Sequence, residues 1–94
     1  MKYAFLIMGN YDPQTDHTAI PDKDVEIIGV ADITQARDAA RRLYADGVGC
    51  IELCGAFGPE GAREIIQATE NKIPVGYVTH FPEQDELFVK AFGK

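Results

Sequence analysis

The stretch that most constrains the fold is residues 49–62, GCIELCGAFGPEGA. Its first half is a short apolar run between glycines, which is typical of a buried strand. Gly58 is the expected cap of a following helix, with Pro59 at the first helical position, where the missing N–H does no harm. A strand, a glycine loop and a helix start form the junction at which open α/β sheets usually hold ligands. The sequence therefore predicts an α/β fold with a candidate ligand site at this junction.

The N-terminal half of the chain supplies further strands and a helix. Residues 3–8 are apolar on both alternating faces, which favours a central strand covered on both sides. Residues 25–31 are rich in β-branched side chains, and residues 18–20 could pair with them as a hairpin. Asp32, with Gln35 three residues later, forms a capping box for a helix that ends near Gly47.

The C-terminal half adds one clear strand and an ambiguous tail. Residues 75–79 read as the last strand, after a helix that begins near residue 58 and ends before Pro74. Residues 82–94 fit either a short helix or a strand. The helix is favoured because four apolar residues share one helical face: Leu87, Phe88, Ala91 and Phe92.

These elements combine into two βαβ units, and right-handed crossovers place both helices on one face of the sheet. We therefore predict a single small α/β domain spanning residues 1–94, with a mainly parallel sheet of about four strands and helices mostly on one face. The other face must be covered either by the C-terminal tail or by a second subunit.

Composition narrows the partners and the compartment. A formal charge of −6 without a Lys/Arg cluster argues against binding nucleic acid or an anionic membrane. The apolar start of the chain is too short to span a bilayer, and no cleavage site follows it, so we expect a cytoplasmic protein. With only 94 residues the domain would gain from burying further apolar surface in a homo-oligomer.

The two cysteines do not read as a disulfide or a redox motif. If Cys50 and Cys54 share a strand, their Cα atoms lie about 13 Å apart, beyond the reach of a disulfide. Their spacing also differs from the Cys-x-x-Cys pattern of redox and zinc sites.

Glu52 is the first candidate for chemistry. Strand alternation points Cys50, Glu52 and Cys54 to one face. A carboxylate among apolar strand residues is unfavourable unless it is paired or solvated. Glu52 is therefore a candidate base, metal ligand or hydrogen-bond anchor. Alternatively, it lies on an exposed or subunit-facing surface and pairs with an arginine or a backbone amide.

The loop after the strand offers ligand-binding candidates: Gly55, Phe57, Gly58 and Glu60. Free N–H groups at the helix start favour an anion there. However, the glycine spacing matches neither the Walker loop nor the dinucleotide fingerprint, and Glu60 already satisfies part of the helix dipole. Simple turn geometry explains the glycines equally well. Phe57 either plugs the sheet edge or lines a pocket.

Two histidines complete the candidate set. His80 follows the last strand at the same sheet edge as Cys54, so the two could act as nucleophile and base. Cys54 and His80 could instead be two ligands of a metal, together with Glu52 or with His17 from the long N-terminal loop. The alternatives are a hydrogen-bonded structural histidine at position 80 and a solvated loop around His17.

Residues 51–60, IELCGAFGPE, preceded by ADGV at 45–48, resemble the signature of a family of small prokaryotic proteins known only as a domain of unknown function. The strands at 3–9 and 74–77 lie where that family has its strands, so the resemblance covers most of the chain. It implies the architecture and no mechanism. The βαβα run is also loosely similar to part of an aldolase-type TIM barrel, in which a strand glutamate and a glycine-rich loop face the substrate.

Three functions remain open from the sequence. The leading hypothesis is binding of a small polar metabolite at the C-terminal edge of the sheet, with or without catalysis, by five residues: Glu52, Cys54, Gly55, Gly58 and His80. The second is a structural or interaction protein that acts through a homo-oligomeric sheet interface. The third is an enzyme, using Cys54 and His80 or a metal, that acts on a carbonyl or ester substrate.

Overall fold

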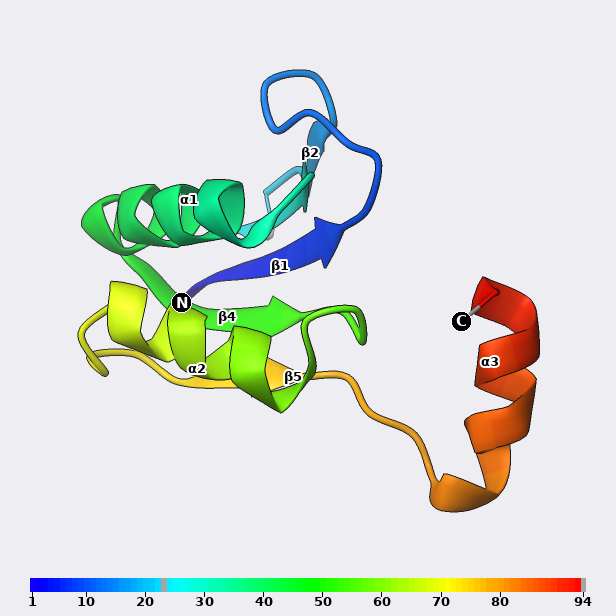
Figure 1. Ribbon diagram of the computed structural model, residues 1–94. Helices are drawn as coiled ribbons and strands as arrows, with labels where there is room; N and C mark the ends of the chain where they lie inside the picture. The colour runs from blue at the N-terminus through cyan, green and yellow to red at the C-terminus, as the bar shows by residue number, and fades with distance from the viewer. Residues whose placement is uncertain (23, 94) are drawn as a thin grey trace.

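Five strands form one mixed sheet in the order β2-β3-β1-β4-β5 (Figure 1) in the computed structural model, which describes residues 1–22 and 24–93. The strands are β1 (Lys2–Met8), β2 (His17–Ile20), β3 (Val25–Val30), β4 (Val48–Leu53) and β5 (Val75–Tyr77). β1 runs parallel to β3 and β4, and β4 runs parallel to β5. β1 is therefore the central strand, as predicted.

The sheet has one strand more than the predicted four or so, because the possible hairpin strand does form. β2 pairs antiparallel with β3, which makes the sheet mixed. All four residues of β2 are exposed. A short edge strand without a buried face leaves little hydrophobic pattern in the sequence, which is why its signal was weak.

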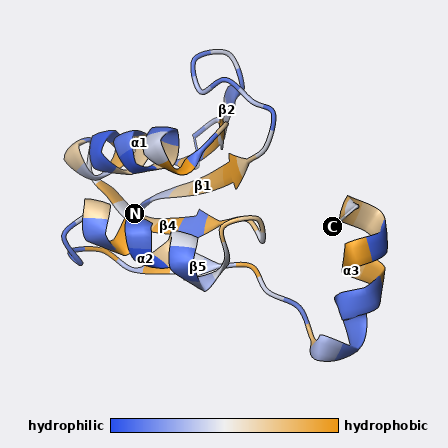
Figure 2. Cartoon of the chain, in the orientation of Figure 1, coloured by the Kyte–Doolittle hydropathy of each residue, from blue (hydrophilic) through white to orange (hydrophobic). Residues whose placement is uncertain are grey.

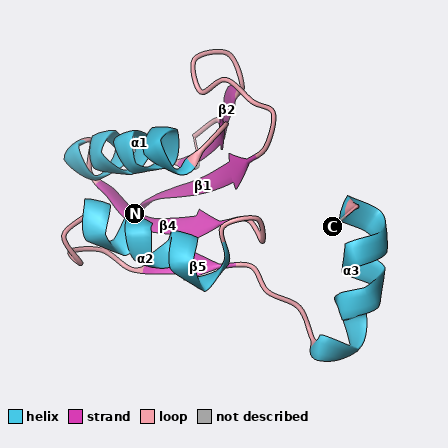
Figure 3. Ribbon diagram, viewed as in Figure 1, coloured by secondary structure: helices cyan, strands magenta, loops and turns pink. Residues whose placement is uncertain are grey.

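Two helices cover one face of the sheet (Figure 3). α1 (Ile33–Ala45) connects β3 to β4, and α2 (Gly58–Ala68) connects β4 to β5. The side chain of Arg37 on α1 joins the two helices, with Nη1 2.7 Å from Oε1 of Glu64 on α2. This arrangement confirms that both crossover helices lie on the same side.

The start of α1 confirms the predicted capping box. Oδ1 of Asp32 accepts a hydrogen bond of 2.8 Å from the backbone N–H of Gln35. Oε1 of Gln35 in turn accepts one of 2.8 Å from the N–H of Ala31, one residue before the cap. The first bond satisfies a donor that the first turn of a helix leaves unpaired, and the second is a variant of the capping box in which the return bond reaches the residue before the cap.

The start of α2 differs from the prediction. Phe57, not Gly58, is the capping residue, and it makes no side-chain capping bond. Gly58 is already the first residue of the helix and has a φ of 63°, a left-handed conformation that glycine adopts without strain. The glycine therefore serves the sharp turn into the helix.

The hydrophobic core lies between the sheet and the two helices. Ala4 and Leu6 of β1 and Ile51 and Leu53 of β4 are fully buried there, against α1 and α2. The alternate residues point to the opposite face and are only partly buried. We call this opposite side the open face, and its main residues are Tyr3, Phe5, Ile7, Val25, Ile27, Cys50 and Glu52. The prediction that β1 is covered on both sides is therefore wrong for this chain alone, because within residues 1–22 and 24–93 no layer covers its second face.

The C-terminal tail is helical, as favoured from its apolar spacing. It forms a 3₁₀ turn, η1 (Pro82–Gln84), followed by α3 (Asp85–Phe92). Figure 1 shows α3 beyond the carboxyl ends of the strands, away from both faces of the sheet. Every residue from 77 to 93 is exposed. The chain's own tail therefore leaves the open face uncovered.

In the part of the chain that the structure describes, no helix is both long and apolar enough to cross a membrane.

Candidate functional site

Glu52 stands on the open face, one residue before the end of β4. The strand register places it between Phe5 of β1 and Gly76 of β5. A Cβ atom at position 76 would collide with Oε1 of Glu52, so only glycine leaves room for the carboxylate. The Glu52 carboxylate therefore lies across β5 in a space that Gly76 keeps clear.

The carboxylate of Glu52 has no partner of its own. The residue is partly buried, yet within residues 1–22 and 24–93 no hydrogen bond or ion pair holds its side chain. Its oxygens are not among the buried polar atoms left without a partner, so water reaches them. The Glu52 carboxylate is thus an acceptor that is open to solvent.

Tyr3 and Cys50 lie beside Glu52 on the same face, and they are paired with each other across β1 and β4. Burial raises the pKa of the Cys50 thiol, and the negative charge of Glu52 raises it further. Burial also raises the pKa of the Tyr3 phenol, with smaller contributions from Glu52 and Cys50. Both groups therefore stay protonated at neutral pH and can donate hydrogen bonds.

The charge of Glu52 makes a testable difference to Cys50. In Glu52→Gln the pKa of the Cys50 thiol is expected to fall toward its ordinary value, because one of the two causes of its rise is gone. Alkylation of Cys50 by iodoacetamide should then be faster than in the wild type at any pH below the pKa of the thiol, since the thiolate reacts. Peptide mapping after timed alkylation separates Cys50 from Cys54. An unchanged Cys50 rate would contradict the proximity of the two groups.

Cys54 does not share this cluster, although strand alternation predicted that it would. It follows the end of β4 and packs against the hydrophobic core. Its Sγ accepts a hydrogen bond of 3.3 Å from the backbone N–H of Met8, and its own N–H donates to the carbonyl of Leu6 at 3.1 Å. The cysteine thus closes the gap between the carboxyl ends of β1 and β4. Both cysteines are free thiols.

The predicted ligand loop is filled mainly by the protein itself. Phe57 is 6% exposed and belongs to the core, so it plugs the sheet edge. A side chain at Gly55 would lie 3.6 Å from the carbonyl oxygen of Val78, which brings this loop next to the chain leaving β5. Gly58 makes the turn into α2, and Glu60 is exposed in its first turn. The turn into α2 explains Gly58, whereas a Cβ at Gly55 would make only an ordinary contact.

Each of the two histidines has its own partner, which is neither Glu52 nor Cys54. Nε2 of His80 is 2.7 Å from Oδ1 of Asp85, and its ring stacks on Phe88 with centroids 3.8 Å apart. Nε2 of His17, on β2, is 3.2 Å from Oε1 of Glu26 on β3. Within residues 1–22 and 24–93, no three His, Cys, Asp or Glu residues are placed to hold a metal ion. In the same residues no hydrogen bond joins Cys54 to His80, and the metal candidates do not form a site.

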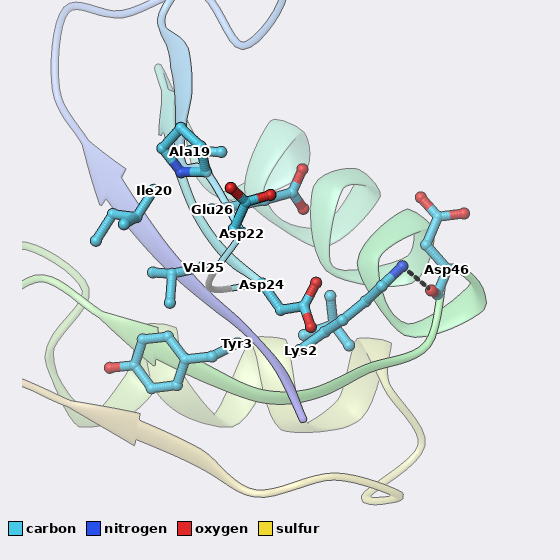
Figure 4. Close-up of a pocket in the computed structure, with 11 residues that line it drawn as sticks. Lys2, Tyr3, Ala19, Ile20, Asp22, Asp24, Val25, Glu26 and Asp46 are labelled. Atoms are coloured by element: carbon cyan, nitrogen blue, oxygen red, sulfur yellow. Dashed lines mark hydrogen bonds between the residues drawn. The ribbon is translucent and has the colours of Figure 1, made fainter.

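A cavity that the sequence did not reveal opens at the amino ends of the strands (Figure 4). Its volume is about 380 Å³, and four of the residues that line it are acidic: Asp22, Asp24, Glu26 and Asp46. Lys2 crosses it, and its Nζ donates to the carbonyl oxygen of Asp46 at 3.1 Å (Figure 4). Tyr3 also lines it, so it adjoins the open face. The residues that line the cavity come from separate segments of the chain, so no local sequence motif predicts it.

Fold and site together define a small α/β domain with two helices on one face of a five-stranded mixed sheet and, on the other, a carboxylate that is unpaired within the described residues. The chain belongs to a family of unknown function, DUF6506, whose model matches residues 1–93. No curated protein and no solved structure matches the chain. The family membership confirms the resemblance to a family of unknown function and adds no activity, so the function must be argued from the geometry.

Proposed function

We propose that this protein binds a small polar ligand on the open face, at the carboxylate of Glu52. The observation that carries the proposal is that the Glu52 carboxylate, on a partly buried residue, has no partner within residues 1–22 and 24–93 and lies in a space kept clear by Gly76. The carboxylate oxygens are open to solvent, so they are free to accept hydrogen bonds from a ligand. A ligand with a donor group would replace the water that meets them.

The neighbours of Glu52 indicate the chemistry of the ligand. Glu52 accepts from an N–H or O–H group, while the protonated Tyr3 and Cys50 can donate to an acceptor. Phe5 offers an apolar surface beside them. With a formal charge of −6 on the chain, a neutral or cationic compound is favoured over an anion. Amines and polyhydroxy compounds have the required groups.

Native mass spectrometry of protein purified gently, beside its denatured mass, tests the proposal. Wild type is expected to retain a small molecule that Glu52→Gln loses, because the amide removes the charge and alters the acceptor. Glu60→Gln is the matched control: it makes the same change at the start of α2, where the sequence placed a binding site, and should retain the molecule.

A thermal-shift screen with amines, amino acids and polyols extends the test if the purified protein is free of ligand. At least one compound should raise the Tm of wild type and of Glu60→Gln without raising that of Glu52→Gln. If the Glu60 change abolishes binding and the Glu52 change does not, the ligand lies at the helix start instead. If no compound distinguishes Glu52→Gln from wild type, the proposal is wrong.

A second candidate function is assembly of this cytoplasmic protein through its sheet. The observation in its favour is that α1 and α2 cover one face and leave an apolar face bare. Small domains gain much of their stability from covering such surfaces. Ligand binding and assembly are compatible, because the same face would serve both.

A further inference from the structure

We propose that the C-terminal arm of one copy, residues 78–93, packs on the open face of a second copy, and that the exchange is reciprocal. The product is a two-fold dimer in which each sheet is covered by the partner's α3. The inference rests on the arm and the open face alone and does not require a ligand at Glu52.

The arm is organised as a unit before it meets any partner. The ring of His80 stacks on Phe88, and Phe88 lies 5.9 Å from Phe92 between ring centroids. Oδ1 of Asp85 lies 2.7 Å from Nε2 at the edge of the His80 ring, so the linker before η1 is tied to the helix after it. The arm therefore presents a preformed aromatic row. Binding such a preorganised segment loses less conformational entropy than ordering a flexible tail would.

The helix of the arm lacks the packing it needs. α3 has eight residues, whereas isolated helices shorter than about 12–15 residues are marginal in water. Its apolar side chains are open to solvent, with Leu87 58% and Phe92 72% exposed, and Phe81 before it is 75% exposed. Figure 2 shows hydrophobic segments on α3 with no other element beside them. An apolar surface must therefore cover this helix when it is stable.

The open face is the complementary surface, and a second copy reaches it more directly than the chain itself. The arm leaves β5, an edge strand, and continues past the carboxyl ends of the sheet (Figure 1). Phe81 is extended, with φ −67° and ψ 145°. To fold back onto its own open face, the chain would have to reverse just after β5. Docking on a second copy keeps the observed course of the linker.

The available area is sufficient for a stable dimer. With about 150–250 Å² for each large apolar side chain and the exposed fractions above, one arm offers on the order of 500 Å² of apolar surface. The arm would cover a similar area of the partner's sheet, so two exchanged arms bury about 2,000 Å². Stable protein interfaces bury about 1,200–2,000 Å².

The net charge of the chain predicts how an apolar contact between two copies responds to salt. Each copy carries a formal charge of −6, so two copies repel at low ionic strength. Salt screens this repulsion and leaves the apolar contact in place. The dimer is therefore expected to become tighter, not weaker, as salt is added.

The mass of the full-length protein in solution tests the proposal. By light scattering after size exclusion, wild type should have twice the 10.3 kDa of one chain. The double variant Phe88→Asp with Phe92→Asp should run as a monomer, because the apolar stripe of α3 is lost. Val89→Asp places the same group outside that stripe, on a residue that is 55% exposed, and should remain a dimer. A monomeric wild type, or a double variant that stays dimeric, would overturn the proposal.

Mixing two monomeric variants separates arm exchange from direct sheet-to-sheet contact. Ile7→Asp places a charge on the open face and leaves the arm unchanged. The Phe88/Phe92 double variant places charges on the arm and leaves the open face unchanged. Mixed together, they should form a heterodimer held by one arm, seen by native mass spectrometry. Absence of the heterodimer, with circular dichroism showing both variants folded, would also overturn the exchange. If wild type is a monomer that still binds a ligand at Glu52, only the arm exchange is wrong. If wild type is a dimer that binds no ligand, only the proposed ligand site is wrong.

Discussion

Replacement of Ile51 by alanine is expected to lower the free energy of unfolding by about 2–5 kcal/mol, the range for removing a large aliphatic side chain from a packed core. Ile51 is 0% exposed, and its neighbours across the sheet are Ala4 of β1 and Val75 of β5. The vacated space lies under both helices, and fixed secondary structure around it limits collapse. Urea unfolding followed by circular dichroism measures the change.

Ile20→Ala is the matched control, because it removes the same atoms from a residue that is 50% exposed on the edge strand β2. Its expected loss is below about 1 kcal/mol. Both variants should be compared with wild type at one protein concentration, since association adds to apparent stability. Equal losses at the two positions would contradict the placement of the core on the helix side of β4.

The second large effect is expected for Gly76→Ala, in ligand binding and not in stability. The added methyl would occupy the space of the Glu52 carboxylate, which is the end of a flexible side chain and can swing away. The fold should therefore change in stability by less than about 1 kcal/mol. Losing a charged hydrogen bond to the ligand should weaken affinity by about 10- to 100-fold. Calorimetric titration with the compound found by native mass spectrometry measures it.

Gly49→Ala provides the comparison for Gly76→Ala. A methyl at position 49 also meets only the end of a flexible side chain, that of Met1, but it is remote from Glu52 in the register. Its affinity for the compound should match that of wild type. If Gly76→Ala also binds normally, the space beside Glu52 is not the ligand site.

The fold was largely predictable because most of its determinants are local. The capping box at Asp32 and Gln35, the two crossover helices and the one-sided stripe of α3 are patterns within single segments. β2 was a weak signal because it has no buried face. The cap of α2 was misplaced by one residue because a glycine there can serve as cap or as turn.

The site was only partly predictable because it depends on pairing between strands. Glu52 stood out as a carboxylate in an apolar strand, but nothing in the sequence places Tyr3 opposite Cys50 or Gly76 beside Glu52. Cys54 does not lie on the predicted face because β4 ends at Leu53, one residue before it. Its thiol instead accepts a hydrogen bond from the backbone N–H of Met8. His80 was expected at the sheet edge, and its contacts with Asp85 and Phe88 draw it into the arm instead.

The apolar character of both faces of β1 now has a consistent explanation. The sequence indicated a strand covered on two sides, and one side is bare in the single chain. If the partner's arm covers that side, the pattern in residues 3–8 describes the dimer, in which Glu52 and its neighbours would also be shielded from water. Shielding strengthens the hydrogen bonds that a ligand would make there.

The most direct test is a cross-link between the arm and the open face. Cys50 already lies on that face, and Ala91→Cys adds a thiol to the apolar stripe of α3, in a background with Cys54→Ser. With a short bismaleimide, the expected product has the mass of two chains, and peptide mapping joins position 50 of one to position 91 of the other. Val89→Cys in the same background should cross-link far less. A product of one chain's mass, or no cross-link at position 91, would contradict the exchange of arms.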